Sequence, residues 1–385
     1  MRQQRIVIVG AGIVGLSTAY TLLTQGMKQV IVLEQEAVDH QRSTSSGLSR
    51  LLRFEYGSAP WFTTMVRLSL NRWQSLERIS KRTLYTRTGL LVLGTEEDNF
   101  AQPSYRMLRA LGLPIERLSE YECTQRFPQF ATQNYDILTH NAEAGILHAS
   151  TCLQTLKEHI EDLGGTIYES CRVTHINNNS QHRPVQLHLS CGDRLLADRV
   201  VLAIGPWVHR LLHDLHLPVR LTRQYVLYFA KLPISSFGVD VFPAFIASDL
   251  YGFPIHTTNP AWLKATTHTF GMPADPDEVP VMDERTITSV ACRLRQLLPA
   301  LEQAKLAHVD ACMYDVTPDE NFILDRVPND PRIVFATGLT GHGFKFGLLL
   351  GELLSSMVAG TLPPVPLERF QLARFGHRQP EVSVA

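Results

Sequence analysis

Near its N-terminus the chain reads Ile6-Val-Ile-Val-Gly10-Ala-Gly12-Ile-Val-Gly15, a short apolar run that enters a glycine-rich turn. The apolar run predicts a buried strand, and the residues after the turn predict a helix. Gly10 permits a tight turn, Gly12 lets the backbone approach a pyrophosphate, and Gly15 lets helix and strand pack closely. We therefore expect a dinucleotide-binding unit here.

The start of this helix and the end of the next strand complete the unit. At Ile13 and Val14 the helix N-terminus offers unpaired N–H groups and the positive end of its dipole to phosphates. A second strand-like run, residues 30–33, ends at Glu34, whose carboxylate is placed to accept hydrogen bonds from a ribose. An acid at this position would repel a 2′-phosphate, so NADP is disfavoured, while FAD and NAD both remain.

Length, charge and cysteine content narrow the class of protein. A chain of 385 residues with 44% hydrophobic content can bury a large core and suggests two domains. Its net charge of −1 gives no electrostatic case for a nucleic-acid partner. No apolar run approaches the ~20 residues that span a membrane, and the six cysteines lack paired metal-ligand spacing. We expect a cytoplasmic protein with reduced thiols, no bound metal and no membrane partner.

The remaining pattern predicts how the chain is divided. Residues 67–81 predict a helix whose core-facing stripe is Leu68, Trp73, Leu76 and Ile79. Strands are expected at 88–94, 166–168, 185–189, 200–203 and 225–230, with a helix at 151–163 and a β-rich stretch to Gly271. Residues 333–358 then repeat the order strand, glycine turn, helix, so nucleotide-binding pieces lie at both ends of the sequence. This interleaved layout favours a flavoprotein over a nicotinamide dehydrogenase.

Several motifs resemble monomeric sarcosine oxidase and N-methyltryptophan oxidase, members of the D-amino-acid-oxidase superfamily of FAD enzymes. They are Gly10–Gly15, Gly47-Leu-Ser-Arg50-Leu-Leu-Arg53-Phe-Glu-Tyr56-Gly57, Ala203-Ile-Gly205-Pro-Trp207, Tyr251-Gly-Phe-Pro254, Lys264-Ala-Thr-Thr-His268-Thr-Phe-Gly271, Cys312-Met-Tyr314 and Gly341-His-Gly343-Phe-Lys345-Phe346. They occur in the family's order over nearly the whole chain.

The resemblance implies an α/β fold with two domains of α+β organisation. A Rossmann-type FAD-binding domain is expected from residues 1–82, 145–215 and 312–375. An interleaved substrate domain, built on a large mixed β-sheet, is expected from residues 83–144 and 216–311. By the same resemblance, FAD is contacted by Gly10, Gly12, Ile13, Val14, Gly15, Glu34, Ser46, Arg50, Val173, Gly205, Trp207, Cys312, Gly341, Gly343 and Lys345.

Cys312 matches the family cysteine that bonds covalently to the 8α-methyl carbon of the flavin. This chemistry needs a thiolate beside an electron-poor ring, so a nearby cation should assist. The alternative is that Cys312 is only a small buried apolar residue.

Three cations are expected near the ring. Arg50 and Arg53 are three residues apart and would share one face of a helical turn. The resemblance assigns Arg53 and Lys345 to the substrate carboxylate, which an arginine fork pairs with bidentately, and it places Arg50 against the flavin. Alternatively, these charges are solvated or pair with an acid such as Glu55. Solvation is not expected for Lys345, because two phenylalanines flank it.

Lys264 matches the lysine that activates oxygen in this family, where an ammonium stabilises developing superoxide. His268 and Tyr251 align with residues that border the substrate. Related oxidases carry histidine where this chain has Ser45 or Ser46. Because serine is smaller and does not titrate near neutrality, we expect a roomier and less basic pocket, which puts sarcosine itself in doubt as the substrate.

These expectations define a reaction. We expect an FAD-dependent oxidase of secondary amino acids, N-methylated or cyclic, in which hydride passes to flavin N5, water hydrolyses the imine, and O2 reoxidises the flavin to give H2O2. The expected partners are a small amino acid and O2, and the expected state is a monomer. Three alternatives stay open: an amino-acid dehydrogenase of the same fold, a deaminating oxidase of primary amino acids, and a non-catalytic flavin-binding subunit.

Overall fold

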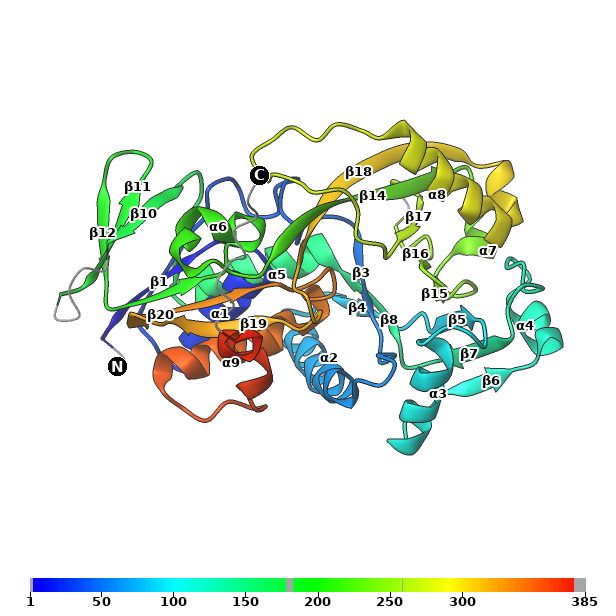
Figure 1. The fold of residues 1–385 in the computed structure, drawn as a ribbon, viewed down its shortest axis with the longest axis horizontal. Helices are drawn as coiled ribbons and strands as arrows, with labels where there is room; N and C mark the ends of the chain where they lie inside the picture. The colour runs from blue at the N-terminus through cyan, green and yellow to red at the C-terminus, as the bar shows by residue number, and fades with distance from the viewer. Residues whose placement is uncertain (1–2, 178–182, 258, 377–385) are drawn as a thin grey trace.

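A computed structural model describes residues 3–177, 183–257 and 259–376. These residues form two parts that lie side by side and are joined by the long strands β14 (Arg220–Ala230) and β18 (Lys305–Val316) (Figure 1). The described residues form four β-sheets, two of which are large. The α/β class expected from the sequence is confirmed.

The first large sheet has six strands in the order β19-β20-β13-β1-β2-β9. Their bounds are β1 Arg5–Val9, β2 Gln29–Leu33, β9 Thr166–Tyr168, β13 Arg199–Leu202, β19 Ile323–Val327 and β20 Asp330–Thr337. All pairings are parallel except β19 with β20. Four of the five β1 residues are buried, as expected for a parallel strand covered on both faces. The carboxyl ends of β1 and β2 therefore meet at one edge of the sheet.

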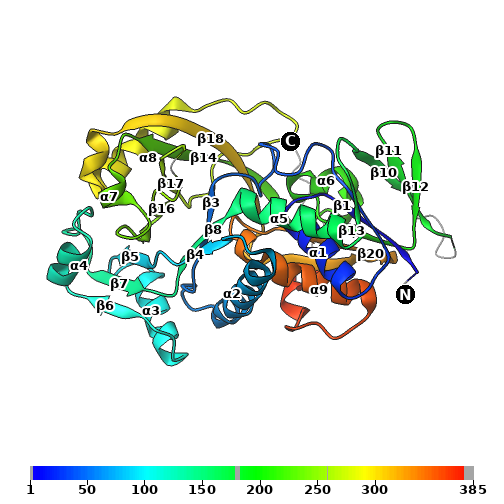
Figure 2. The same ribbon diagram turned by 180° about the vertical axis from the view of Figure 1, so that it is seen from behind.

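Helices α1 (Ile13–Thr24), α9 (Gly347–Ala359), α5 (Ala149–Asp162) and α2 (Pro60–Ser80) gather on one side of this sheet (Figure 2). Helix α1 packs against both α9 and α5. A Cβ at Gly351 would lie 2.5 Å from the Ser17 carbonyl carbon, so glycine permits this close contact of α1 and α9. The N-terminal and C-terminal segments thus share one core.

The other side of the six-stranded sheet carries a smaller sheet and several short helices. The small sheet comprises β10 (Val173–Asn177), β11 (Val185–Leu189) and β12 (Arg194–Ala197), all antiparallel. The 3-10 turns of the described residues, which lie in several parts of the molecule, are Gly205–Trp207, His213–Leu215, Pro299–Glu302, Phe344–Phe346, Glu368–Phe370 and Leu372–Phe375. Helix α6 is Val208–Leu211, and it packs near β10.

The second large sheet has eight strands in the order β18-β14-β17-β16-β15-β5-β7-β6. The bounds of the other six strands are β5 Leu90–Gly94, β6 Glu116–Leu118, β7 Ile137–Asn141, β15 Ala244–Ala247, β16 Leu250–Phe253 and β17 Leu263–Thr267. Only β15 and β5 pair in parallel, so the sheet is mixed, as expected. Four helices accompany it: α3 Ala101–Ala110, α4 Glu120–Arg126, α7 Ile234–Phe237 and α8 Glu284–Leu297.

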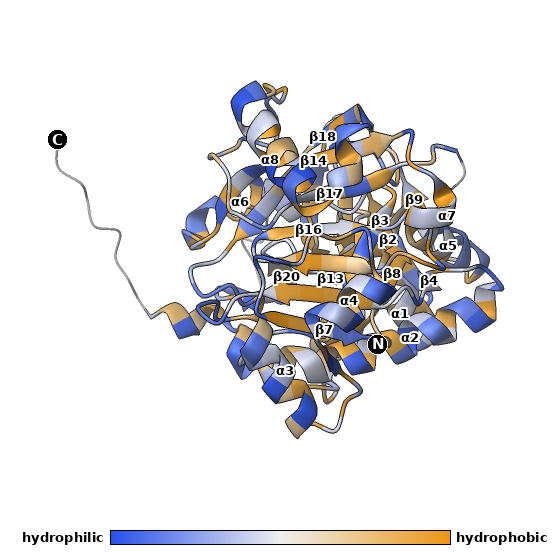
Figure 3. Cartoon of the chain, turned by 90° about the vertical axis from the view of Figure 1, so that its right-hand side faces the viewer, coloured by the Kyte–Doolittle hydropathy of each residue, from blue (hydrophilic) through white to orange (hydrophobic). Residues whose placement is uncertain are grey.

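A small three-stranded sheet links the two parts: β3 (Ser49–Leu52), β8 (Gly145–His148) and β4 (Tyr85–Thr86). Strands of the inner core are strongly apolar, whereas the outer helices alternate apolar and polar residues (Figure 3). The strands of the six-stranded sheet all come from 1–82, 145–215 and 312–375, while β18 crosses the proposed boundary at residue 312. The exact division into two domains stays a proposal.

Some local predictions were wrong. Helix α2 begins at Pro60 rather than at residue 67, and Ile79 is 62% exposed rather than core-facing, because the last turn of α2 extends beyond the packed part of the helix. Arg50 lies in β3, not on a helical turn, because β3 pairs with β8 from far along the chain. In the described ranges, no helix is both long and apolar enough to cross a membrane.

Candidate functional site

A single cavity of about 1310 Å³ extends from the edge of the six-stranded sheet to the face of the eight-stranded sheet. Every predicted site residue except Gly15 lines it. We call the part near β1, β2 and β10 the nucleotide end, and the part near β16, β17 and β18 the ring end. The two ends belong to one continuous space.

The three glycines of the first turn have different surroundings. Gly10 has a φ of +98°, and a Cβ there would lie 2.4 Å from the Ala203 carbonyl oxygen. A Cβ at Gly15 would lie 1.9 Å from the Gly10 carbonyl oxygen, so Gly15 is needed where helix meets strand. At Gly12 the nearest atom would be Ser45 Oγ at 3.1 Å. Gly12 is thus less closely surrounded than Gly10 and Gly15, and it lines the cavity where a diphosphate is expected.

Hydrogen bonds fix the acid and the helix terminus at the nucleotide end. The buried Glu34 carboxylate accepts from the backbone N–H of Ala11 at 2.7 Å and of Glu36 at 3.1 Å. Ser45 Oγ accepts from the backbone N–H of Ile13 at 3.0 Å. These contacts hold Glu34 beside the glycine turn, where a ribose is expected.

Three further predicted residues line the nucleotide end from the other side of the cavity. Val173 begins β10, Gly205 has a φ of +51°, and Trp207 ends the 3-10 turn that follows. The Trp207 indole donates from Nε1 to Asp277 Oδ1 at 2.9 Å. Trp207 is thus held in place by a residue from the other large-sheet region.

At the ring end, Arg50 and Lys264 both donate a hydrogen bond to the backbone carbonyl of Ser49 in β3. Arg50 donates to the carbonyl oxygens of Ser49, Thr44 and Ser46. Ser46 therefore contacts Arg50 through its backbone and not through its hydroxyl. Lys264 Nζ donates to the Ser49 carbonyl oxygen at 2.7 Å. Burial, with the Arg50 charge as a second cause, holds the pKa of Lys264 well below its usual range. No acid among the described residues forms an ion pair with either cation.

Cys312 is a free thiol on β18 that lines the ring end. Burial raises the pKa of this thiol, and the positive charges of Arg50 and Lys264 act in the opposite direction. The cations that thiolate formation requires are therefore present, although burial outweighs them in the protein alone.

Arg53 and Lys345 are a pair of cations that form no ion pair with an acid in the described part of the chain. Arg53 Nη1 is buried and has no hydrogen-bond partner among the described residues, while its guanidinium lies 4.2 Å from the Tyr56 ring centroid. Lys345, only 4% exposed, donates from Nζ to Tyr56 Oη and to the His342 carbonyl oxygen, both at 2.9 Å. Burial, and then Arg53, lowers the pKa of Lys345 well below its usual range. A buried N–H without a partner is costly, so this corner is suited to a ligand carboxylate.

Glu55 is not an acidic partner of Arg53. Its buried carboxylate accepts from Asn141 Nδ2 at 2.8 Å and from the Phe54 N–H at 2.9 Å, and it forms no salt bridge with Arg53. Burial raises the pKa of Glu55. The alternative in which Glu55 pairs with Arg53 is therefore wrong.

His268 and Tyr251 stand on the opposite wall of the ring end. Their ring centroids are 6.2 Å apart, and Tyr251 Oη lies 3.1 Å from Tyr314 Oη. Burial, followed by the charges of Arg53 and Lys345, lowers the pKa of His268 to about 4. Burial raises the pKa of Tyr251 to about 12. Both groups are therefore neutral near pH 7 and act as hydrogen-bonding rather than charged groups.

The second glycine turn supports the same end. Gly341 has a φ of +71°, and a Cβ there would lie 2.5 Å from the Tyr314 ring. A Cβ at Gly343 would lie 2.6 Å from Leu339. These glycines let the turn pack against Tyr314 and bring Lys345 to the cavity.

Sequence reasoning did not assign three residues of the ring end. Tyr56 contacts Arg53 and Lys345, Tyr314 contacts Tyr251, and the His342 carbonyl oxygen accepts from Lys345. All three stand inside motifs that the sequence analysis had singled out. Their position beside a predicted site residue was the available signal.

The cavity fits an FAD molecule in two respects. Its nucleotide end offers a glycine cradle, a helix N-terminus and a buried acid, and its ring end gathers cations without acidic partners. The family model for FAD dependent oxidoreductases, DAO, matches residues 5–357.

This chain belongs to the DAO family.

Relatives match along nearly the full length. Peroxisomal sarcosine oxidase of Mus musculus is 32% identical over 381 residues, covering 96% of this chain and 95% of the relative. Monomeric sarcosine oxidase of Bacillus sp. (strain B-0618) is 29% identical over 367 residues, covering 91% of each. The crystal structure of glycine oxidase from Geobacillus kaustophilus has a TM-score of 0.81 at 19% identity and covers 97% of this chain and 99% of that one, so it supports the fold alone. The DAO-family protein is thus similar to sarcosine oxidases in sequence.

Proposed function

We propose that this DAO-family protein oxidises secondary amino acids, either N-methylated or cyclic, using FAD and O2. The observation that carries the proposal is the Arg53–Lys345 corner, where two cations that form no ion pair with any described acid lie in the cavity that also contains the glycine cradle. The names of the relatives, sarcosine oxidases, support the same reaction class. A small amino acid and O2 are the proposed partners, and a monomer is the proposed state.

The chain's own residues would bind and orient the substrate. The unpartnered Arg53 N–H and the Lys345 ammonium receive the carboxylate, and such charge-assisted contacts are stronger than neutral ones. Tyr251 and His268, neutral near pH 7, border the amine from the opposite wall. The flavin, when bound, would accept a hydride and pass electrons to O2.

The remaining cations would act on the cofactor side. Arg50, fixed by three backbone carbonyls, would hold a positive charge beside the ring. Lys264 would place its ammonium where negative charge develops on oxygen. Its Nζ donates to the Ser49 carbonyl among the described residues, which leaves further N–H groups for that purpose. Cys312 would hold the flavin covalently. After acid precipitation, we expect the wild-type protein to keep the yellow colour of the flavin and the Cys312→Ala variant to lose it.

A panel of amines, read by peroxide release, tests the proposed reaction. Each secondary amino acid is paired with its primary analogue and with its methyl ester. We expect peroxide from secondary amino acids and little from the esters, which lack the anion that Arg53 and Lys345 receive. Ammonia release from the primary analogues would favour deamination. Reduction of a dye without peroxide would favour a dehydrogenase, and either result would contradict the proposal.

A further inference from the structure

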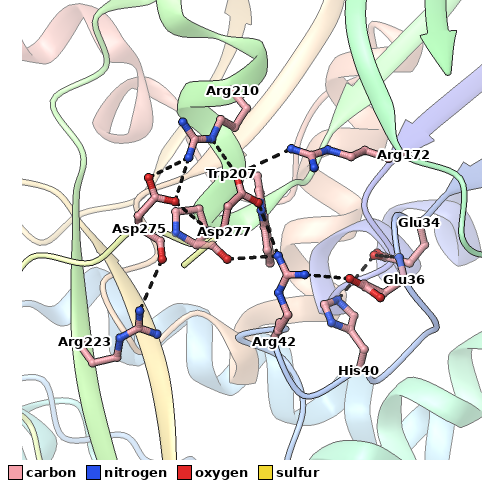
Figure 4. A network of polar contacts seen from close by, with 11 residues as sticks. Glu34, Glu36, His40, Arg42, Arg172, Trp207, Arg210, Arg223, Asp275 and Asp277 are labelled. Carbon is pink, nitrogen blue, oxygen red and sulfur yellow. Dashed lines mark hydrogen bonds and ion pairs between the residues drawn. The ribbon is translucent and has the colours of Figure 1, made fainter. Parts of the chain in front are cut away.

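A segment of the eight-stranded-sheet region reaches across to the nucleotide end of the cavity. Residues 271–283, which we call the clasp, connect β17 to α8. The clasp first follows β14, with the Arg223 N–H donating to the Met272 carbonyl oxygen at 2.8 Å and the Ala274 N–H to the Leu221 carbonyl oxygen at 3.1 Å. It then presents Asp275 and Asp277 to residues around the six-stranded sheet (Figure 4).

These two aspartates hold three arginines from separate segments. Both Asp275 carboxylate oxygens lie 2.8 Å from Arg210 Nη2. Asp277 Oδ2 lies 3.0 Å from Arg210 Nε and 3.7 Å from Arg172 Nη2, while its Oδ1 lies 3.5 Å from Arg42 Nη2. The Asp277 N–H also donates to Asp275 Oδ1 at 2.8 Å, which fixes the two carboxylates relative to each other.

The partners of the clasp form a wall of the nucleotide end. Arg172, Arg210 and Trp207 all line the cavity, together with Glu34 and Val173. Trp207 donates to Asp277, and the Arg42 guanidinium lies 5.5 Å from the indole centroid. Asp275 and Asp277 do not themselves line the cavity. They act through the residues that do.

The charge on this wall of the nucleotide end depends on the position of the clasp. With the clasp displaced, Arg172 and Arg210 would lose the carboxylates that neutralise them, and Arg42 would keep Glu36 at 2.9 Å. Uncompensated guanidinium groups on this wall would attract the diphosphate of FAD, so they favour its entry and oppose its release. Faster release from an opened wall therefore requires the contacts of the clasp to be the larger barrier. With the clasp in place, two acids neutralise the cluster and cover this wall.

We propose that the clasp gates the passage of FAD at the nucleotide end, with Asp275 and Asp277 as positioning residues that hold the closed wall. The inference rests on FAD as the cofactor, which the family match supports, and not on the identity of the substrate. FAD release then requires the carboxylate–arginine contacts to break first. Because these side chains are 32–47% exposed, salt should weaken the closed state.

FAD release from three proteins tests the proposal. All carry Cys312→Ser, so that a covalent bond cannot mask release, and two of them add Asp275→Asn/Asp277→Asn or Glu278→Gln. Glu278 is a matched control, because it lies on the clasp but forms no ion pair with any described residue. Each FAD-loaded protein is diluted, and the rise of free-flavin fluorescence gives the release rate. We expect release about tenfold faster from the double variant and unchanged release from Glu278→Gln.

The dependence of FAD release on salt tests the proposal without a change in the clasp. Raising NaCl from about 0.05 to 0.5 M shortens the Debye length severalfold, so release from the Cys312→Ser protein should accelerate while the double variant responds little. Thermal unfolding of the FAD-free proteins checks that the double variant is folded. Equal release rates for the double variant and its parent, or no effect of salt on the parent, would overturn the proposal. Either result leaves the amine panel, and hence the proposed reaction, untouched.

Discussion

The two ends of the cavity are built in different ways. At the nucleotide end, the glycine turn, the helix N-terminus and Glu34 come from one continuous stretch, residues 10–34, and the backbone supplies most of the contacts. At the ring end, Arg53, Lys264 and Lys345 come from distant parts of the chain, and the proposed chemistry depends on their side-chain charges. Steric fit therefore controls the first end, and the balance of buried charge controls the second.

The largest expected effect separates two glycines of the same turn. Gly15→Ala places a Cβ 1.9 Å from the Gly10 carbonyl oxygen, so we expect no stably folded protein. Gly12→Ala meets only Ser45 Oγ at 3.1 Å, so we expect a folded protein that binds FAD weakly. Circular dichroism and FAD titration of both variants measure the difference. Equal behaviour of the two would show that the steric description of the nucleotide end is wrong.

At the ring end, Arg53→Met should mainly affect substrates that carry a carboxylate. We expect kcat/KM for a secondary amino acid to fall roughly 10²–10³-fold, because the variant leaves a buried anion without its guanidinium partner. FAD binding should not change, because the proposed role of Arg53 is to bind the substrate carboxylate. Steady-state kinetics and an FAD titration test this. Arg109→Met, on the outer end of α3, serves as a control with expected wild-type kinetics.

Lys264→Met should separate the two half-reactions. If the buried ammonium stabilises charge on oxygen, reoxidation should slow by about 10²-fold while anaerobic reduction by substrate changes much less. Lys345→Met should do the reverse, because Lys345 is placed to bind the carboxylate. Stopped-flow absorbance of the flavin follows both steps. Equal slowing of both half-reactions in Lys264→Met contradicts the assignment.

A smaller effect is expected on the stability of the folded protein at acid pH, through His268 at the ring end. Burial, followed by the charges of Arg53 and Lys345, holds the pKa of His268 at about 4, below the usual 6.5. Between these values the unfolded chain binds protons that the folded protein does not, so stability rises with pH there. The contribution is fully present above about pH 6.5 and is lost as the pH falls toward 4.

Urea unfolding at about pH 7, 5.5 and 4.5 measures this loss, and His268→Asn should show a shallower dependence on pH. The expected difference between the variant and the wild type is on the order of 1–2 kcal/mol. A variant with the same pH dependence as the wild type would show that His268 is not held neutral by its surroundings.

The strand, glycine turn, helix and second strand of residues 5–33 were predicted from the sequence, because each depends mainly on near neighbours in the chain. Gly10 has a positive φ, a Cβ at Gly15 would meet the Gly10 carbonyl oxygen, and Glu34 follows β2 directly. The mixed sheet and the DAO family were also predicted, through motifs spread along the whole chain. The burial of Lys345 followed from its two phenylalanine neighbours.

Contacts between distant segments could not be predicted in this way. The strand that holds Arg50 could not be predicted, because the pairing of β3 with β8 leaves no signal within residues 47–57. Tyr56 and Lys345 are 289 residues apart, so their hydrogen bond depends on the folded topology. The clasp was likewise invisible, since Asp275 and Asp277 acquire a role only when three arginines from other segments surround them.

Anaerobic reduction of the flavin by a secondary amino acid and by its methyl ester tests the main proposal most directly. The two compounds share the oxidisable C–N bond and differ only in the anion that Arg53 and Lys345 are placed to receive. We expect the acid to bleach the flavin at least about 100-fold faster than the ester, and this ratio to collapse in Arg53→Met. Equal rates for acid and ester in the wild-type protein would contradict the account.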